Sequence, residues 1–367
     1  MNMRANNQIE PEKLKSAPIQ GKTKYRFRVF PFLFAGAVGS AWRSLKNSLK
    51  PLLGRPKYFD EHGLFLRQYI LHVTGLRPLR KLTSTSLPSE GAGSQALMVM
   101  NAINFAGSFG LNYLHTPFTT IQHAERPMND WAVAWEVLFN LGSDELACNI
   151  GRRDVANFSY NYFDLDLCFG WRSQWDQLAD RFKDMIPEFR RKYYLNKSPR
   201  TTDELTVAVH VRRGDVSADD PAYFTSNQTI LRTLSEVKSI LDVHKRAYNI
   251  RVYSQGVDAD FAELSLPGVE LFLSVDAIWT MQELIEADVL IMAKGCFSYY
   301  AALISDGIRI FEPEKLSGDD LLPDWKWRSV PVSDSWIPSR ADGSFDRAAF
   351  EHELSLLVRA KAVAAKH

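Results

Sequence analysis

Two consecutive arginines follow an apolar segment near the middle of the chain. The segment reads VAVHVRRGDV, residues 207–216, and its alternation is typical of a β-strand. This alternation puts His210 and Arg212 on one face and brings Arg212 and Arg213 to the carboxyl end of the strand. Because each guanidinium presents a rigid fork of donors, the pair can hold a phosphate or diphosphate without a metal ion. Asp215 can orient one of the two arginines. The alternative role for Arg212 and Arg213 is to form ordinary salt bridges with carboxylates of the protein.

The segments around these arginines alternate between strand and helix patterns. Between residues 205 and 313, short apolar runs predict strands, and the longer segments between them have helical periodicity. Strands this far apart in the chain cannot pair through tight hairpins, which favours a parallel sheet with helices on both faces. Ligands bind such sheets at the carboxyl ends of the strands, where Arg212 and Arg213 are expected.

A second unit of this kind is predicted in the first half of the chain. The glycine loop GAGSQAL precedes an apolar helix expected from Ser94 to Ala106, and a strand is expected from Leu111 to His115. We therefore predict an α/β protein with two domains, because 367 residues exceed one ordinary core. The expected parts are a basic extension, a first domain, a second domain and a tail with a C-terminal helix, at residues 1–87, 88–200, 201–313 and 314–367.

Composition and cysteine usage narrow the class of protein. With 46% hydrophobic and 24% charged residues, the chain is neither wholly disordered nor fibrous. The cysteines, Cys148, Cys168 and Cys296, are odd in number and widely spaced, so they indicate neither a disulfide framework nor a CxxC metal site. A reducing compartment fits this usage, and we expect a cytoplasmic location.

Charge is distributed unevenly along the chain. Residues 1–87 carry 16 Lys and Arg against 4 Asp and Glu, which leaves 28 against 39 for the remainder. A basic head on an acidic body indicates contact with an anionic membrane surface, an acidic partner or the body itself, and a poorly ordered, solvated extension is the alternative. No nucleic-acid partner is expected. The apolar run at residues 29–42 is shorter than the roughly 20 residues that span a bilayer. It suits a peripheral membrane helix or packing onto the body.

Three segments resemble one family of transferases. HVRRGD, residues 210–215, resembles the H-x-R-R-x-D signature of metal-independent fucosyltransferases, which include α1,2-, α1,6- and protein O-fucosyltransferases. ADVLIMAKGCFSYYAALIS, residues 287–305, is similar to the later family segment with an aromatic-rich turn, although Cys296 and two tyrosines replace the common serine and tryptophans. GAGSQAL resembles the glycine-rich start of the family's first domain.

The resemblance implies a fold and an activity. The implied fold is GT-B, in which two Rossmann-like domains face a cleft, and the implied activity is inverting, metal-independent transfer of fucose from GDP-fucose to a hydroxyl of a glycan acceptor. No further cofactor is expected. One alternative is a transferase of the same fold that uses a different nucleotide sugar. The other is a non-catalytic protein that binds GDP or a glycan on the same fold. Arg212 would contact the β-phosphate of GDP as the catalytic arginine, and the nucleotide pocket would further include His210, Arg213, Asp215, Phe297 and Ser298.

Two roles stay open on the sequence alone. The family's acidic pair after the second strand is missing, because the chain reads YSQG at residues 253–256. We favour Glu283 as the acceptor of the base's hydrogen bonds, with Asp276 and Asp288 as alternatives. For the general base that takes the acceptor's proton, the candidates are His115, at a predicted strand end, and His123.

Other residues have a chemical and a structural interpretation. The DLD triplet, Asp164 to Asp166, matches the D-x-D metal motif of a different transferase fold, and we interpret it as coincidence. Tyr113 and Trp131 could stack on a sugar, but core positions are the alternative for both.

Overall fold

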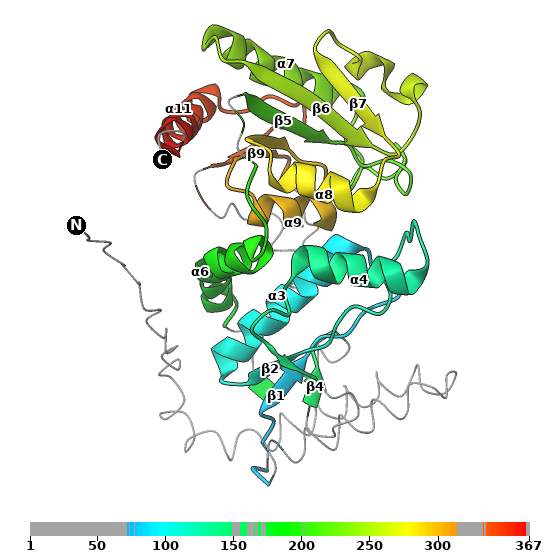
Figure 1. The fold of residues 1–367 in the computed structure, drawn as a ribbon, viewed down its shortest axis with the longest axis vertical. Coiled ribbons are helices and arrows are strands. Elements are labelled where there is room, and N and C mark those ends of the chain that lie inside the picture. The colour runs from blue at the N-terminus through cyan, green and yellow to red at the C-terminus, as the bar shows by residue number, and fades with distance from the viewer. Residues whose placement is uncertain are drawn as a thin grey trace, which may run out of the picture.

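The structure, a computed structural model, describes most of the chain after its first 71 residues. The described residues are 78–148, 155–159, 174–200, 204–313 and 335–364, with isolated positions at 72, 74–76, 165, 168–169, 202 and 333. Two parallel sheets lie at opposite ends of this part, with helices between them (Figure 1).

The first domain is built on a four-stranded parallel sheet in the order β3-β2-β1-β4. Its strands are β1 (Lys81–Thr83), β2 (Asn112–His115), β3 (Leu146–Ala147) and β4 (Val155–Asn157). Its helices are α3 (Ala92–Phe109), α4 (Met128–Phe139) and α6 (Trp175–Tyr194). Gly110 ends α3 in the left-handed conformation, with φ of 66°, which glycine adopts without steric cost.

The second domain contains a six-stranded parallel sheet. Its strands are β5 (Leu205–His210), β6 (Tyr248–Ser254), β7 (Val269–Leu273), β8 (Val289–Ile291), β9 (Ile308–Phe311) and β10 (Trp336–Pro338). Its helices are α7 (Asn227–Val243), the 3-10 helix η3 (Asp258–Leu264), α8 (Ala277–Ile285), α9 (Cys296–Ile304) and α11 (Arg347–Ala364).

The strand order of this sheet is β10-β9-β8-β5-β6-β7. When β5 is numbered 1 and the sheet is read from β7 to β10, this order becomes 3-2-1-4-5-6, which is the order of a Rossmann fold. The direction of winding reverses between β5 and β8, and ligands of such sheets bind outside the carboxyl ends of the strands at this point. The expected α/β class is therefore confirmed, with a Rossmann-like parallel sheet in each of two domains.

The alternation expected in β5 is also observed. Val207, Val209 and Val211 pack into the hydrophobic cluster beneath α7 and α11, whereas Ala208 belongs to the cluster on the opposite face. His210 comes two residues after Ala208 on that opposite face, so the valines anchor the strand while the polar residues reach its carboxyl end.

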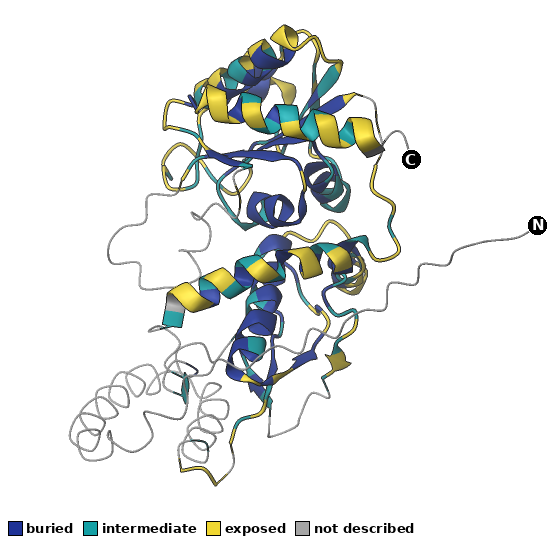
Figure 2. Cartoon of the chain, turned by 90° about the vertical axis from the view of Figure 1, so that its left-hand side faces the viewer, coloured by how far each residue is buried: buried dark blue, intermediate teal, exposed yellow. Residues whose placement is uncertain are grey.

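The helices between the two sheets form a shared core. The rings of Phe139 on α4 and Tyr300 on α9 have centroids 4.4 Å apart, and Trp135 meets Phe297 edge-on at 6.2 Å. Helix α3 is buried on almost all sides because it also packs against α9, as the dark helices between the domains in Figure 2 illustrate. The domains therefore meet through apolar surface rather than through a flexible linker alone.

Both sheets take strands from beyond the domain boundaries expected at residues 88 and 313. Strand β1 precedes residue 88, and β10 follows residue 313 and pairs with β9. Helix α11 packs Phe350 and Leu354 into the core of the second domain. No described helix is long and apolar enough to cross a membrane. The apolar run at residues 29–42 lies outside the described residues.

Candidate functional site

A cavity of about 370 Å³ lies between the two domains, at the carboxyl ends of β5, β6 and β8. Its volume lies within the range of small-molecule sites. From the second domain, the polar and aromatic lining residues are His210, Arg212, Arg213, Asp215, Tyr223, Ser254, Gln255, Thr280, Lys294 and Phe297. The first domain contributes residues 89–94, together with Ile121, Gln122, His123, Glu125, Trp131 and Trp135.

Arg212 reaches the cavity directly after β5. Its Nε and Nη2 atoms donate to the two carboxylate oxygens of Asp215 at 3.2 and 2.7 Å. The guanidinium lies 4.9 Å from the centre of the Tyr223 ring. Burial lowers the pKa of Arg212, but the Asp215 carboxylate outweighs burial and the net shift is upward. The hydrogen bonds from Arg212 lower the pKa of Asp215, so both groups are charged and the arginine is held in a fixed orientation.

Arg213 has a different environment, although it also lines the cavity. It donates to the carbonyl oxygen of Thr225 at 2.9 Å and to Oδ1 of Asn227 at 2.8 Å. A further bond of 2.8 Å to the Arg212 carbonyl closes the turn, and Phe224 stacks against the guanidinium at 4.2 Å. Because most of its donors are used by the protein, Arg213 supports the loop that carries Arg212 and adds positive charge to the cavity.

The amino terminus of α9 faces the same cavity. Its first residues, Cys296 and Phe297, line the cavity, and its N-cap is Gly295, which provides no capping side chain. A Cβ atom at Gly295 would lie 2.7 Å from Nη1 of Arg212, and the φ of 126° is one that glycine tolerates. The uncapped N–H groups and the helix dipole favour a negatively charged group at this position.

Lys294 adds a further positive charge beside α9. Its Nζ lies 3.1 Å from a carboxylate oxygen of Glu312 and 3.3 Å from the Phe224 carbonyl, and one-tenth of its side chain is exposed. Arg212 donates to its backbone carbonyl at 3.4 Å. Two cationic side chains and a helix amino terminus therefore meet at the switch point between β5 and β8.

His210 connects β5 to α9. Its Nδ1 lies 2.5 Å from Oγ of Ser298, and this hydroxyl oxygen also accepts a bond of 3.1 Å from the backbone N–H of Ala293. Burial, with help from the positive charge of Arg212, lowers the pKa of His210 to about 4. His210 is therefore neutral near pH 7. Ser298 is almost fully buried and lies behind the cavity wall, whereas Phe297 faces the cavity.

The glycine loop of the first domain approaches the second domain closely. A Cβ atom at Gly93 would lie only 2.6 Å from the carbonyl oxygen of Cys296, so a larger residue would push the two helices apart. Gln95 holds the loop by donating to three backbone carbonyls, those of Leu87, Glu90 and Thr120. The loop therefore closes one side of the cavity with backbone rather than with large side chains.

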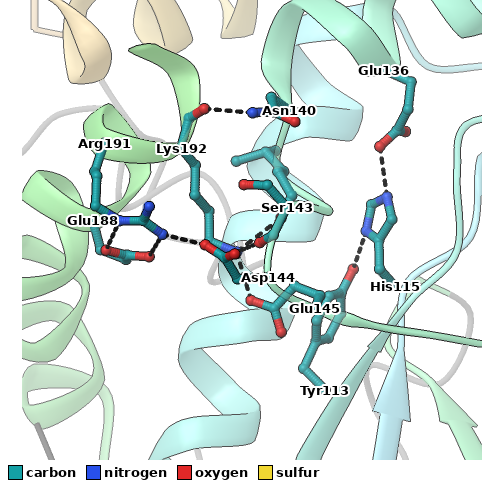
Figure 3. Close-up of polar contacts among 11 residues, drawn as sticks. Tyr113, His115, Glu136, Asn140, Ser143, Asp144, Glu145, Glu188, Arg191 and Lys192 are labelled. Atoms are coloured by element: carbon teal, nitrogen blue, oxygen red, sulfur yellow. Dashed lines mark hydrogen bonds and ion pairs between the residues drawn. The ribbon is translucent and has the colours of Figure 1, made fainter. Parts of the chain in front are cut away.

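The structure does not bring His115 to the cavity. His115 is buried at the end of β2, where Nε2 lies 2.6 Å from Oε1 of Glu136 and Nδ1 lies 3.3 Å from the Tyr113 hydroxyl (Figure 3). Glu136 also accepts a bond from the backbone N–H of Phe118. Both ring nitrogens are engaged inside the first domain, which favours the structural role for His115. His123, the other histidine candidate, does line the cavity.

Glu283 is also held away from the cavity. Its buried carboxylate accepts bonds from Arg200, from Nη1 of Arg251 at 2.8 Å and from the Tyr253 hydroxyl at 3.1 Å. Burial raises its pKa, but the hydrogen bonds from Arg200 outweigh this and the net shift is downward. A carboxylate with three partners inside the protein has little capacity left for a nucleobase.

The two alternatives to Glu283 have partners of their own. Asp276 caps α8 by accepting from the backbone N–H of Trp279 at 2.8 Å, and it pairs with Arg126 of the first domain. Asp288 accepts from the backbone N–H of Thr206 at 2.8 Å and pairs with Lys361 of α11 at 2.6 Å. These aspartates fix a helix and the C-terminal segment.

The two aromatic candidates have different positions. Tyr113 is buried in the first domain and contributes to its core, whereas Trp131 is buried but also lines the cavity. The DLD aspartates lie outside the described residues, and among those described no group of three or more His, Cys, Asp or Glu could hold a metal ion.

Some lining residues were not identified from the sequence, notably Glu90, Glu125, Gln255 and Lys294. The last two follow β6 and β8, and the rule that ligands bind at carboxyl strand ends could have identified them. The two glutamates lie in loops of the first domain, where no periodic pattern distinguishes them.

Comparisons with known proteins give only distant likenesses. No protein-family model and no curated protein sequence match the chain. A solved structure of POFUT1 in complex with GDP has a TM-score of 0.35 and 12% identity, over 64% of this chain and 98% of that one. The E. coli heptosyltransferase WaaC with ADP-2-deoxy-2-fluoro heptose has a TM-score of 0.33 and 8% identity, over 76% and 99% of the two chains.

The dodecameric iron-containing heptosyltransferase TibC, in complex with ADP-D-beta-D-heptose, has a TM-score of 0.36 and 12% identity, over 78% of each chain. These structural neighbours are glycosyltransferases. With TM-scores below 0.5, the likenesses are too weak to assign a function, which must follow from the cavity itself.

Proposed function

We propose that the chain is an inverting, metal-independent glycosyltransferase that binds a nucleoside diphosphate sugar in the interdomain cavity. It transfers the sugar, with fucose from GDP-fucose as the proposed donor, to a hydroxyl of a glycan acceptor. The observation that carries the proposal is the meeting of Arg212, Lys294 and the amino terminus of α9 at the switch point of a Rossmann sheet.

The charges at this point suit a leaving diphosphate. Breaking the bond between the anomeric carbon and the diphosphate oxygen builds negative charge on the departing group. Cations and N–H dipoles that are already oriented stabilise that charge more in the transition state than in the ground state. Asp215 fixes Arg212 in place before the substrate binds, so little reorganisation is needed. His210 is neutral and holds α9 through Ser298 without adding charge.

The acceptor would bind on the side of the first domain. The lining residues there include Glu90, Glu125 and His123, and Trp131 supplies an aromatic surface. We assign to His123 the role of general base that takes the proton of the attacking hydroxyl, because it lies in the cavity and both ring nitrogens of His115 are engaged elsewhere. Attack from this side, opposite the diphosphate, would invert the anomeric centre.

The choice of GDP-fucose follows from the HVRRGD motif. Thermal shifts with GDP, UDP and ADP, followed by GDP release from GDP-fucose across a panel of glycan acceptors, test the proposal. We expect the largest stabilisation with GDP and release that depends on acceptor. Stronger stabilisation by UDP or ADP would overturn the donor assignment but keep the transferase, whereas binding of GDP without any turnover would favour a non-catalytic binder.

The cellular setting proposed here is cytoplasmic, with peripheral membrane contact through residues 1–87. None of the three cysteines forms a disulfide, which is compatible with a reducing compartment. The excess of Lys and Arg in residues 1–87 supports attraction to anionic lipid. Co-sedimentation with vesicles containing phosphatidylserine tests this contact, and equal sedimentation with neutral vesicles would contradict it.

A further inference from the structure

The polar lining of the cavity differs between its two ends. At the ends of β5 and β8 it is charged, with Arg212, Arg213 and Lys294. At the ends of β6 and β7 the lining from the second domain is neutral, with Ser254, Gln255, Val275, Ala277 and Thr280. Glu125 of the first domain also reaches this end and accepts from the backbone N–H of Ala277 at 3.2 Å. A nucleotide whose diphosphate lies at the charged end would extend its nucleoside along the neutral one. This step rests on the proposed function.

Gln255 lies beside the arginine loop. Strands β5 and β6 are in register up to His210 and Tyr253, and the Ser254 hydroxyl donates to the Val211 carbonyl at 2.7 Å. Gln255 follows immediately. Its Oε1 lies directly over Gly214, at a position where a Cβ atom would collide with it. The exposed amide therefore lies next to the point where the diphosphate is proposed to bind.

The amide of Gln255 has unused hydrogen-bonding capacity. It makes no hydrogen bond to any residue that the structure describes, although it lines the cavity. The nearby carboxylates of Asp276 and Glu283 are bonded within the protein. Gln255 is thus the side chain at this end with both a donor and an acceptor available.

We infer that Gln255 binds the ribose hydroxyls of the donor nucleotide. In a Rossmann sheet the residue at the end of the second strand commonly contacts the ribose, and β6 is the second strand here. An amide can donate to one hydroxyl of the 2′,3′-diol and accept from the other. A carboxylate at this position can also accept from a ribose hydroxyl, but its charge would attract Arg212 and Arg213 and compete with the diphosphate. A neutral glutamine avoids this competition.

The test compares ribose and deoxyribose ligands. The dissociation constants of GDP and 2′-deoxy-GDP are measured by calorimetry. ADP and 2′-deoxy-ADP form a second pair, because GDP and ADP have the same ribose and differ only in the base. We expect the wild-type protein to prefer the ribonucleotide by about three- to tenfold, the value of one hydrogen bond in a partly exposed site. In Gln255→Ala this ratio should fall to about one.

Two further variants separate the contact from a structural effect. Gln228→Ala, on α7, removes an exposed amide that bonds Glu263 at 3.0 Å outside the cavity lining, and it should keep the wild-type ratio. Gln255→Glu should keep a preference for ribose but bind both nucleotides more weakly, because its charge competes for the arginines.

The outcomes distinguish this inference from the proposed function. Equal affinity of the wild-type protein for the ribo and deoxy ligands, or an unchanged ratio in Gln255→Ala, would overturn the role of Gln255 while leaving nucleotide binding intact. Failure of all four nucleotides to bind would overturn both.

Discussion

Two histidines end parallel strands in this molecule, one in each domain, and their surroundings are opposite. His210 ends β5, bonds Ser298 and faces the cavity. His115 ends β2, where Glu136 and Tyr113 engage both of its ring nitrogens. The same residue type at the same kind of position therefore serves a binding site in one domain and a buried network in the other.

The difference extends to the cations near each histidine. Lys192 is buried beneath the first-domain network and donates to Glu145 at 2.7 Å and to the Leu141 carbonyl at 3.2 Å (Figure 3). Lys294 and Arg212 also have protein partners, yet they line a cavity and lie beside an uncapped helix terminus. A strand-end position becomes a candidate site when the sheet's switch point and a helix amino terminus leave room for a ligand.

The largest expected effect is a loss of kcat at His123, which lines the cavity on the acceptor side. His123→Ala should lower kcat by about 10²- to 10⁴-fold, the usual contribution of a general base. The measurement is acceptor-dependent GDP release under saturating donor. A kcat within a factor of about two of wild type would remove His123 from the mechanism.

The corresponding change at the buried histidine of the same domain should affect stability instead. His115→Ala leaves the partly buried Glu136 carboxylate without its ring partner and should lower the free energy of unfolding by about 1–3 kcal/mol. Urea denaturation measures this change. The kcat of the folded fraction should stay close to the wild-type value. A large loss of kcat at unchanged stability would contradict the structural role and support a catalytic role for His115.

A smaller, pH-dependent effect tests the environment of His210. The pKa of His210 is lowered to about 4 by burial, whereas an unfolded histidine has a pKa of about 6.5. As pH falls between these values, the unfolded chain binds a proton that the folded protein does not, so the free energy of unfolding decreases.

His210→Asn retains a polar atom near Ser298 but removes this titration. The free energy of unfolding of wild type relative to this variant should therefore fall between about pH 6.5 and about pH 4. The remaining histidines are common to both proteins and cancel in the comparison. Parallel stability curves over this range would show that His210 is not buried in the neutral form.

Local patterns predicted the parts of the molecule that depend on neighbouring residues. The alternation around Val207 and Val209 identified β5, and the order of strand and helix patterns identified the Rossmann-like domain. The same reasoning placed Arg212 at a strand end because position along a strand is local information. The C-terminal helix expected in the tail is α11, which begins at Arg347.

Tertiary partners could not be predicted in this way. Glu283 was a reasonable candidate for the nucleobase until the fold brought it to Arg200 and Arg251, which come from a loop and from β6. His115 likewise meets Glu136 only because α4 packs beside β2. Whether a polar residue has spare hydrogen-bonding capacity depends on such distant pairings.

The central claim is that Arg212 stabilises the leaving diphosphate, and one assay tests it most directly. GDP release from GDP-fucose is measured in EDTA for wild type, Arg212→Ala and Arg191→Ala, the last removing a first-domain arginine that pairs with Asp144 and Glu188. We expect wild-type activity to survive EDTA, Arg212→Ala to lose about 10²- to 10³-fold in kcat, and Arg191→Ala to resemble wild type. Loss of wild-type activity in EDTA, or an unaffected Arg212→Ala, would contradict the mechanism.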